Sequence, residues 1–205
     1  MNRTLKILLL TDACFIFAAG LFGPIYAIFV EGIGGDLLDA GWAAAAFMLA
    51  AGVVVFLLSR WENRVHHFEP MIIGGYAIRT VAIFGYIFVA DAWHLMVVQI
   101  ILGLGEALTI PAYDALFTTH IDKGQEASRW GDWEAMAYIV TALSAVIGAS
   151  IATAFGFQTM FIAMFGVSLG GLIISIRLMP ELIHRLPKRA SVMMTGSRKK
   201  SRKRR

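Results

Sequence analysis

The sequence predicts an all-α membrane protein with six transmembrane helices. Hydrophobic residues make up 58% of its 205 residues and charged residues only 16%, whereas soluble domains carry about 25% charged residues. The hydrophobic residues form continuous runs, each close to the roughly 20 residues with which a helix crosses a bilayer. The alternating pattern of a transmembrane β-barrel is absent from these runs.

Each run is expected to be a helix, because a helix pairs its own backbone polar groups, as lipid requires. The predicted spans cover residues 7–30, 40–58, 71–90, 92–119, 135–154 and 157–176. They define one transmembrane domain over residues 1–180, which is followed by a basic tail over residues 181–205.

The positions of Lys and Arg predict the orientation, since cytoplasmic connections are enriched in these residues. They occur in the N-terminal tail, after the second and fourth spans, and above all in the C-terminal tail, while the other connections contain none. We therefore expect a plasma-membrane protein with both termini in the cytoplasm. The basic tail is expected to lie against anionic lipid; binding to nucleic acid or to a protein partner is the less favoured alternative, and no nucleic-acid partner is expected.

Four ionisable residues lie inside the predicted spans, where a charge costs about 2.5 to 3.5 kcal/mol at a helix centre. They are Asp12, Arg79, Glu106 and Asp114. At about 1.5 Å per residue, the depths of Arg79 and Glu106 differ by less than the reach of an Arg side chain. Two interpretations remain open: a polar cavity with acids that exchange protons, or a structural ion pair with polar contacts near helix ends.

The fourth predicted span is interrupted by Gly103, Gly105 and Pro111. Glycine and proline in a charged span are typical of binding sites in transporters, but glycines also permit close packing of helices. Gln99 and Tyr113 lie on the same span and are secondary candidates for cavity residues.

The connection from Thr118 to Glu134 carries closely spaced charges of both signs, including Asp122 and Arg129. With Arg60 and Arg64 after the second span, these residues are predicted to form a cytoplasmic gate. The alternative is an ordinary solvated loop.

The sequence contains no nucleotide-binding loop, no metal-ligand spacing and no nucleophile elbow. We therefore expect a protein that is not an enzyme and that holds no metal and no cofactor.

Two spans and one connection resemble the major facilitator superfamily. The first span reads DACFIFAAGLFGPIY over residues 12–26, which is similar to the first helix of the family. The fourth reads QIILGLGEA over residues 99–107, similar to the motif R-x-x-q-G-x-G-x-A, with Gln99 in the place of the Arg. Residues 122–131 resemble the connection between the fourth and fifth helices, where Arg129 would be the recurring Arg.

The connection between the second and third spans departs from the family. It reads LSRWENRV over residues 58–65, and so lacks the Gly and Asp of the motif G-x-x-x-D-R-x-G-R.

The resemblance covers residues 1–180 and thus one six-helix half of a family that normally has twelve helices. It implies a secondary transporter of a small solute, in which a homodimer or a separate second half completes the cavity. Glu106 and Asp114 would bind substrate or couple protons, and Arg79 would be their charge partner. Asp12, Gln99 and Tyr113 would be secondary cavity groups. The rival interpretation is a membrane scaffold or assembly factor without transport activity.

Overall fold

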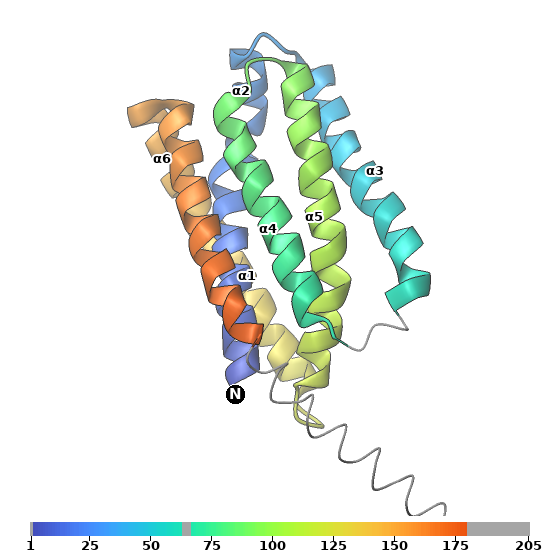
Figure 1. Ribbon diagram of the computed structural model, residues 1–205. Helices are drawn as coiled ribbons and strands as arrows, with labels where there is room; N and C mark the ends of the chain where they lie inside the picture. Colours follow the sequence, from blue (N-terminus) through green and yellow to red (C-terminus); the bar gives the residue numbers. More distant parts are fainter. Residues whose placement is uncertain (1, 63–66, 180–205) are drawn as a thin grey trace, which may run out of the picture.

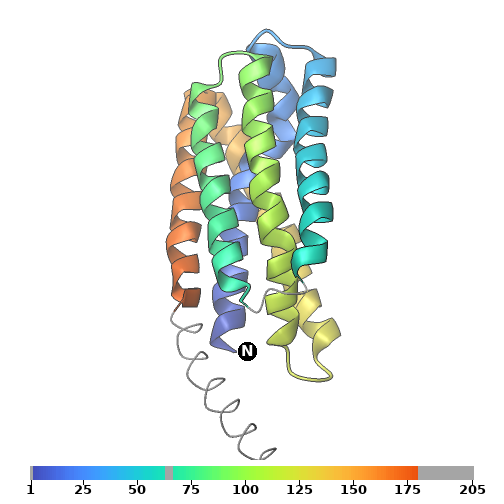
Figure 2. The same cartoon turned by 45° about the vertical axis from the view of Figure 1, so that its right-hand side comes forward.

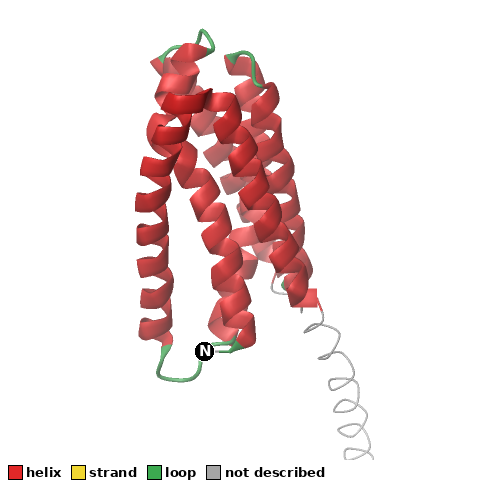
Figure 3. Cartoon of the chain, turned by 90° about the vertical axis from the view of Figure 1, so that its left-hand side faces the viewer, coloured by secondary structure: helices red, strands yellow, loops and turns green. Residues whose placement is uncertain are grey.

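The computed structural model describes residues 2–62 and 67–179, and Figure 3 shows helices and connecting loops in this part of the chain. In chain order the elements are α1 (Arg3–Phe22), η1 (Gly23–Ile25), α2 (Tyr26–Gly32), α3 (Leu37–Glu62), α4 (Glu69–Gly85), η2 (Tyr86–Phe88), α5 (Ala92–Thr119), α6 (Glu126–Ser175) and η3 (Ile176–Leu178). The helices run side by side along one bundle axis (Figures 1 and 2). The predicted all-α membrane class is therefore confirmed, while the predicted tail over residues 181–205 lies outside the described residues.

The first predicted span corresponds to α1, η1 and α2 together. Pro24 lies in the 3-10 turn η1, where its missing N–H and the clash of its ring with the preceding turn interrupt the regular helix. The second, third and fourth predicted spans correspond to α3, to α4 with η2, and to α5. With the first segment and α6, five helical segments among the described residues are long and apolar enough to cross a membrane.

The fifth and sixth predicted spans both lie in α6. Its 50 residues would extend about 75 Å as one helix, far more than a hydrocarbon core of about 30 Å. Gly156 interrupts the helix with φ 82° and ψ 166°, a conformation that glycine adopts without steric cost. The chain turns back there (Figure 1), so that α6 has a first arm (residues 126–155) and a second arm (residues 157–175). The count of six crossings stays a prediction, because only five segments are separate helices.

Helix packing leaves a space inside the bundle. α1 packs along α6, and α5 packs against both α3 and α4, but α1 meets α5 at few points. Aromatic rings meet beside this space, where Phe22 lies edge-on to Tyr86 and Phe161 with ring centres 5.1 and 5.2 Å apart. The helices that surround the space therefore belong to different parts of the sequence.

Candidate functional site

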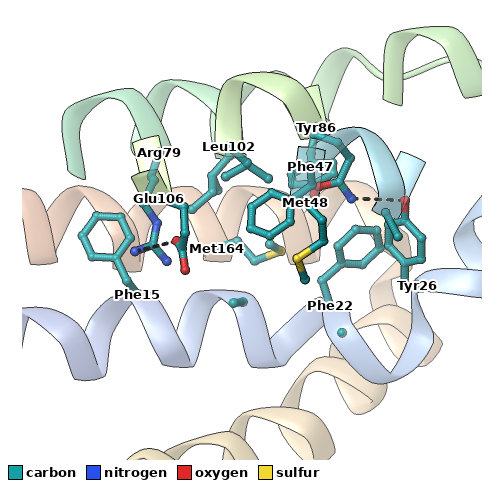
Figure 4. A pocket seen from close by; sticks show the side chains of 15 residues that line it. Phe15, Phe22, Tyr26, Phe47, Met48, Arg79, Tyr86, Leu102, Glu106 and Met164 are labelled. Atoms are coloured by element: carbon teal, nitrogen blue, oxygen red, sulfur yellow. Dashed lines mark hydrogen bonds and ion pairs between the residues drawn. The ribbon is translucent and has the colours of Figure 1, made fainter. Parts of the chain in front are cut away.

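A cavity of about 370 Å³ opens between α1, α3, α4 and α5 (Figure 4). Most of its walls are apolar or aromatic. Its lining residues are Phe15, Ala19, Phe22, Gly23, Tyr26, Ala44, Phe47, Met48, Arg79, Ile83, Tyr86, Gln99, Leu102, Glu106 and Met164. Three of the six predicted site residues are among them.

An ion pair lies at one end of the cavity. Arg79 Nη1 on α4 is 3.1 Å from Glu106 Oε2 on α5, and the two side chains are 13% and 25% exposed. The guanidinium also lies over the Phe15 ring, 4.9 Å from its centre, and 5.8 Å from the centre of the Tyr76 ring. The structure thus confirms the pairing of Arg79 with Glu106 that the sequence predicted.

Gly105 permits this pairing, because it lets α4 approach α5 closely. A Cβ at this position would lie 2.7 Å from Arg79 Cγ and 2.9 Å from the Gly75 carbonyl oxygen. Gly105 therefore permits close helix packing, which is one of the two interpretations of the glycines in this span.

Gly105→Ala is expected to lower the free energy of unfolding by about 1 to 3 kcal/mol, since overpacking forces the neighbouring backbone to move. Thermal or denaturant unfolding of the purified protein in detergent measures the change. Gly74→Ala on α4 is the matched control, because its Cβ would meet open space. Equal stability of the two variants would contradict the close approach.

A hydrogen bond lies at the other end of the cavity. The Gln99 side-chain amide on α5 donates to the Tyr26 hydroxyl on α2, with a distance of 3.1 Å. Gln99 thus lies in the cavity, as expected, and links two helices there.

Asp12 does not line the cavity, contrary to the expectation of a secondary cavity group. Its carboxylate accepts hydrogen bonds from the Tyr76 hydroxyl at 3.2 Å and from the Trp133 indole N–H at 2.8 Å. These bonds connect α1 with α4 and with the first arm of α6. Sequence reasoning did not connect Trp133 with Asp12, because the two residues are 121 positions apart in the chain.

Trp133→Phe is expected to destabilise the protein by about 1.5 to 3 kcal/mol, the range for a hydrogen bond to a charged group. The substitution keeps an aromatic ring but removes the indole N–H and part of the ring volume, and the measurement is the unfolding midpoint in detergent. Trp93→Phe is the control, because Trp93 is an exposed residue at the start of α5. A loss no larger than the control's would show that the bond to Asp12 contributes little.

Tyr113 and Asp114 also lie outside the lining of this cavity. The Tyr113 hydroxyl is buried and has no hydrogen-bond partner among the described residues, and its ring stacks on Phe117 at 5.7 Å. Asp114 is exposed on α5. The predicted site residues therefore divide into a cavity group (Arg79, Glu106, Gln99) and a group nearer the end of the bundle where α1 begins (Asp12, Tyr113, Asp114).

Of the four predicted gating residues, Arg129 and Asp122 have side chains that the structure describes. Arg129 lies in the first turn of α6 rather than in a loop, and it contacts Asp132 Oδ2 at 3.0 Å and Gln125 Oε1 at 2.8 Å. Both partners are within four residues in the chain, so these contacts stabilise the local helix. Asp122 is exposed in the preceding turn and Arg60 lies near the end of α3, while Arg64 lies outside the described residues.

The aromatic walls of the cavity were missed by sequence reasoning, which considered charged and hydrogen-bonding groups. Phe15 and Phe22 line the cavity from α1, and Tyr26 lines it from the start of α2. Their spacing of seven and four residues places them on one helical face, and this is the signal that could have identified them.

Polar groups that face a cavity among apolar helices are typical of membrane transport proteins. The sequence comparison agrees: the model of the major facilitator superfamily matches residues 8–203, and the chain belongs to this family. It is therefore a multi-pass membrane protein of a transporter family.

Two relatives are similar to the chain over most of its length. One is the "Uncharacterized MFS-type transporter YitZ" of Bacillus subtilis (strain 168), 22% identical over 72% of this chain and 89% of the relative. The other is the "Uncharacterized MFS-type transporter Rv1250" of Mycobacterium tuberculosis (strain ATCC 25618 / H37Rv), 24% identical over 70% of this chain and 24% of the relative. The aligned part thus spans most of the first relative and about a quarter of the second.

Proposed function

We propose that this chain is one six-helix half of a secondary transporter that moves a small solute through the cavity between α1, α3, α4 and α5. The observation that carries the proposal is the Arg79–Glu106 ion pair in the wall of that cavity. Ionisable groups at this depth are costly unless they face a cavity or one another. Here they do both, and a quarter of the Glu106 side chain stays exposed to the cavity.

Six crossings with both termini in the cytoplasm fit the chain best. The two arms of α6 meet at Gly156, and each is about as long as a bilayer is thick. The start of α1 and the end of η3 lie at the same end of the bundle (Figures 1 and 2). The bias of Lys and Arg assigns that end to the cytoplasm, and we propose the plasma membrane as the location.

A second six-helix unit is proposed to complete the cavity. An ion pair that faced lipid through an open side would lose its solvation, so another protein surface is expected there. A second copy of this chain, related by an axis along the membrane normal, supplies that surface most simply. A separate half-transporter is the alternative partner.

Proton coupling is proposed to use Glu106 in the cavity and Asp114 on the same helix, since carboxyl groups can bind and release protons across the transport cycle. The test uses purified protein in liposomes that contain a pH-sensitive dye, under an imposed pH gradient, with a panel of small organic cations, anions and neutral solutes. Wild-type protein is expected to release protons when its solute is added. The double variant Glu106→Gln/Asp114→Asn is expected to lose most of this signal.

Asp91→Asn is the matched control, because Asp91 caps the start of α5 outside the cavity. Unchanged proton release in the double variant would refute the assignment of these two acids. Folded wild-type protein that moves neither solute nor protons would favour the scaffold interpretation.

A further inference from the structure

The cavity has two polar ends that are separated by an apolar middle. Figure 4 shows the Arg79–Glu106 pair at one end and the Gln99–Tyr26 hydrogen bond at the other. Gln99 and Glu106 are seven residues apart on α5, which places them on one face and about 10 Å apart along the helix. A ligand that contacts both ends is therefore elongated.

The middle of the cavity is suited to a flat apolar body. Between the polar ends lie aromatic rings and flexible thioethers, contributed by Phe22, Phe47, Met48, Tyr86 and Met164. Aromatic side chains bind other rings by stacked and edge-on contacts, and methionine adapts its shape and makes favourable contacts with rings. An aromatic body fits these walls better than a sugar or another polyhydroxyl solute.

The ion pair offers its negative member to the cavity. The Arg79 guanidinium is covered by the rings of Phe15 and Tyr76 and is half as exposed as the Glu106 carboxylate. The more exposed member of the pair is thus the negative one, so a bound solute meets a carboxylate at this end of the cavity.

We propose that the cavity binds an organic monocation with an aromatic body, whose charged group contacts Glu106 and whose far end lies beside Gln99 and Tyr26. The inference rests on the proposed function, because it names the class of solute for the same cavity. Cation–π contacts with the cavity rings add to the attraction between the cation and Glu106.

The test compares three probes that share an indole ring and a two-carbon chain: tryptamine (cation), tryptophol (neutral) and indole-3-propionate (anion). Equilibrium dialysis measures their binding to the full chain in lipid nanodiscs, with empty nanodiscs as the correction for lipid partitioning. Tryptamine is expected to bind at least tenfold more tightly than either other probe. Glu106→Gln is expected to weaken tryptamine binding at least tenfold without changing tryptophol binding, and Asp91→Asn is expected to change neither.

A charge swap guards against a variant that merely fails to fold. Arg79→Glu/Glu106→Arg keeps the ion pair but moves the positive member to the more exposed position, so the folded variant is expected to prefer indole-3-propionate. No tryptamine binding by wild type, equal binding of all three probes, or a swapped variant that still prefers tryptamine would overturn the proposal.

The binding readout separates this inference from the proposed function. Tryptamine binding that depends on Glu106, without flux in liposomes, would support the site and refute transport. Flux of another solute, without preferential tryptamine binding, would support transport and refute the monocation.

Discussion

Glu106→Leu is expected to lower the free energy of unfolding by about 3 kcal/mol, near the lower end of the range for breaking a buried ion pair. The Arg79 guanidinium would then lie among Phe15, Tyr76 and apolar helices without its carboxylate. It cannot shed its charge by losing a proton. Titration of the purified protein with a denaturing detergent measures the loss.

Arg79→Met is expected to cost less, because the remaining Glu106 carboxylate can take up a proton and become neutral. The double variant Arg79→Met/Glu106→Leu is expected to be close to wild type in stability, since apolar groups of similar volume often replace a buried pair without loss. The stabilities of the two single variants and the double variant form a cycle that isolates the coupling between the side chains.

Arg129 and Asp132 provide the control pair for this cycle. They lie 3.0 Å apart, close to the 3.1 Å of the cavity pair, but at the surface of α6, where an ion pair contributes about 0 to 1 kcal/mol. Either of two results would contradict a stabilising buried ion pair between Arg79 and Glu106. One is that the stability losses of the two single variants of the cavity pair simply add, and the other is that their coupling is no larger than that of the surface pair.

When wild-type subunits are mixed with Glu106→Gln subunits, the transport activity is expected to fall more than in proportion to the fraction of wild-type subunits. If two copies enclose one cavity and each needs its carboxylate, equal mixing leaves about one quarter of the dimers fully wild type. Proton release in liposomes upon addition of the transported solute measures the activity of co-purified subunits that carry two different tags.

Mixing with Asp91→Asn subunits is the control and is expected to preserve the activity. A strictly proportional fall to about one half at equal mixing would mean that each copy works alone or with a different partner.

The sequence predicted the helices well because a transmembrane helix is determined by local composition. Each predicted span coincides with a helical segment of the structure, although the first is interrupted by η1 and the third runs two residues beyond η2. The boundary between the last two spans was placed at residues 155–156, and the backbone turns at Gly156.

The candidate site was predicted less completely, because residue number gives the depth of a side chain but not the direction in which it points. The depth argument brought Arg79 and Glu106 together correctly. The predicted site for substrate or protons joined Glu106 with Asp114, but eight residues on a helix differ by about 80° in direction, and Asp114 lies at the exposed surface.

Tyr113 shows what depends on tertiary packing alone. Gln99, Glu106 and Tyr113 are seven residues apart and therefore follow one stripe of α5. The first two line the cavity, whereas Tyr113 is buried beyond its end. The sequence of α5 alone cannot show where neighbouring helices close over the stripe.

The central claim is that solute passes through the cavity between α1, α3, α4 and α5, and one measurement tests it most directly. Cys14 is the sequence's one cysteine, so Cys14→Ala provides a background in which single cysteines can be alkylated with N-ethylmaleimide. Ala19→Cys places a thiol in the cavity wall, and Val81→Cys places one on α4 at a position that is 64% exposed and does not line the cavity. Complete alkylation, verified by mass, is expected to stop solute-driven proton release in the Ala19→Cys protein and to leave it unchanged in the Val81→Cys protein. Added solute is expected to slow the alkylation of the Ala19→Cys protein. Full activity of the alkylated Ala19→Cys protein, or equal inhibition at both positions, would contradict transport through this cavity.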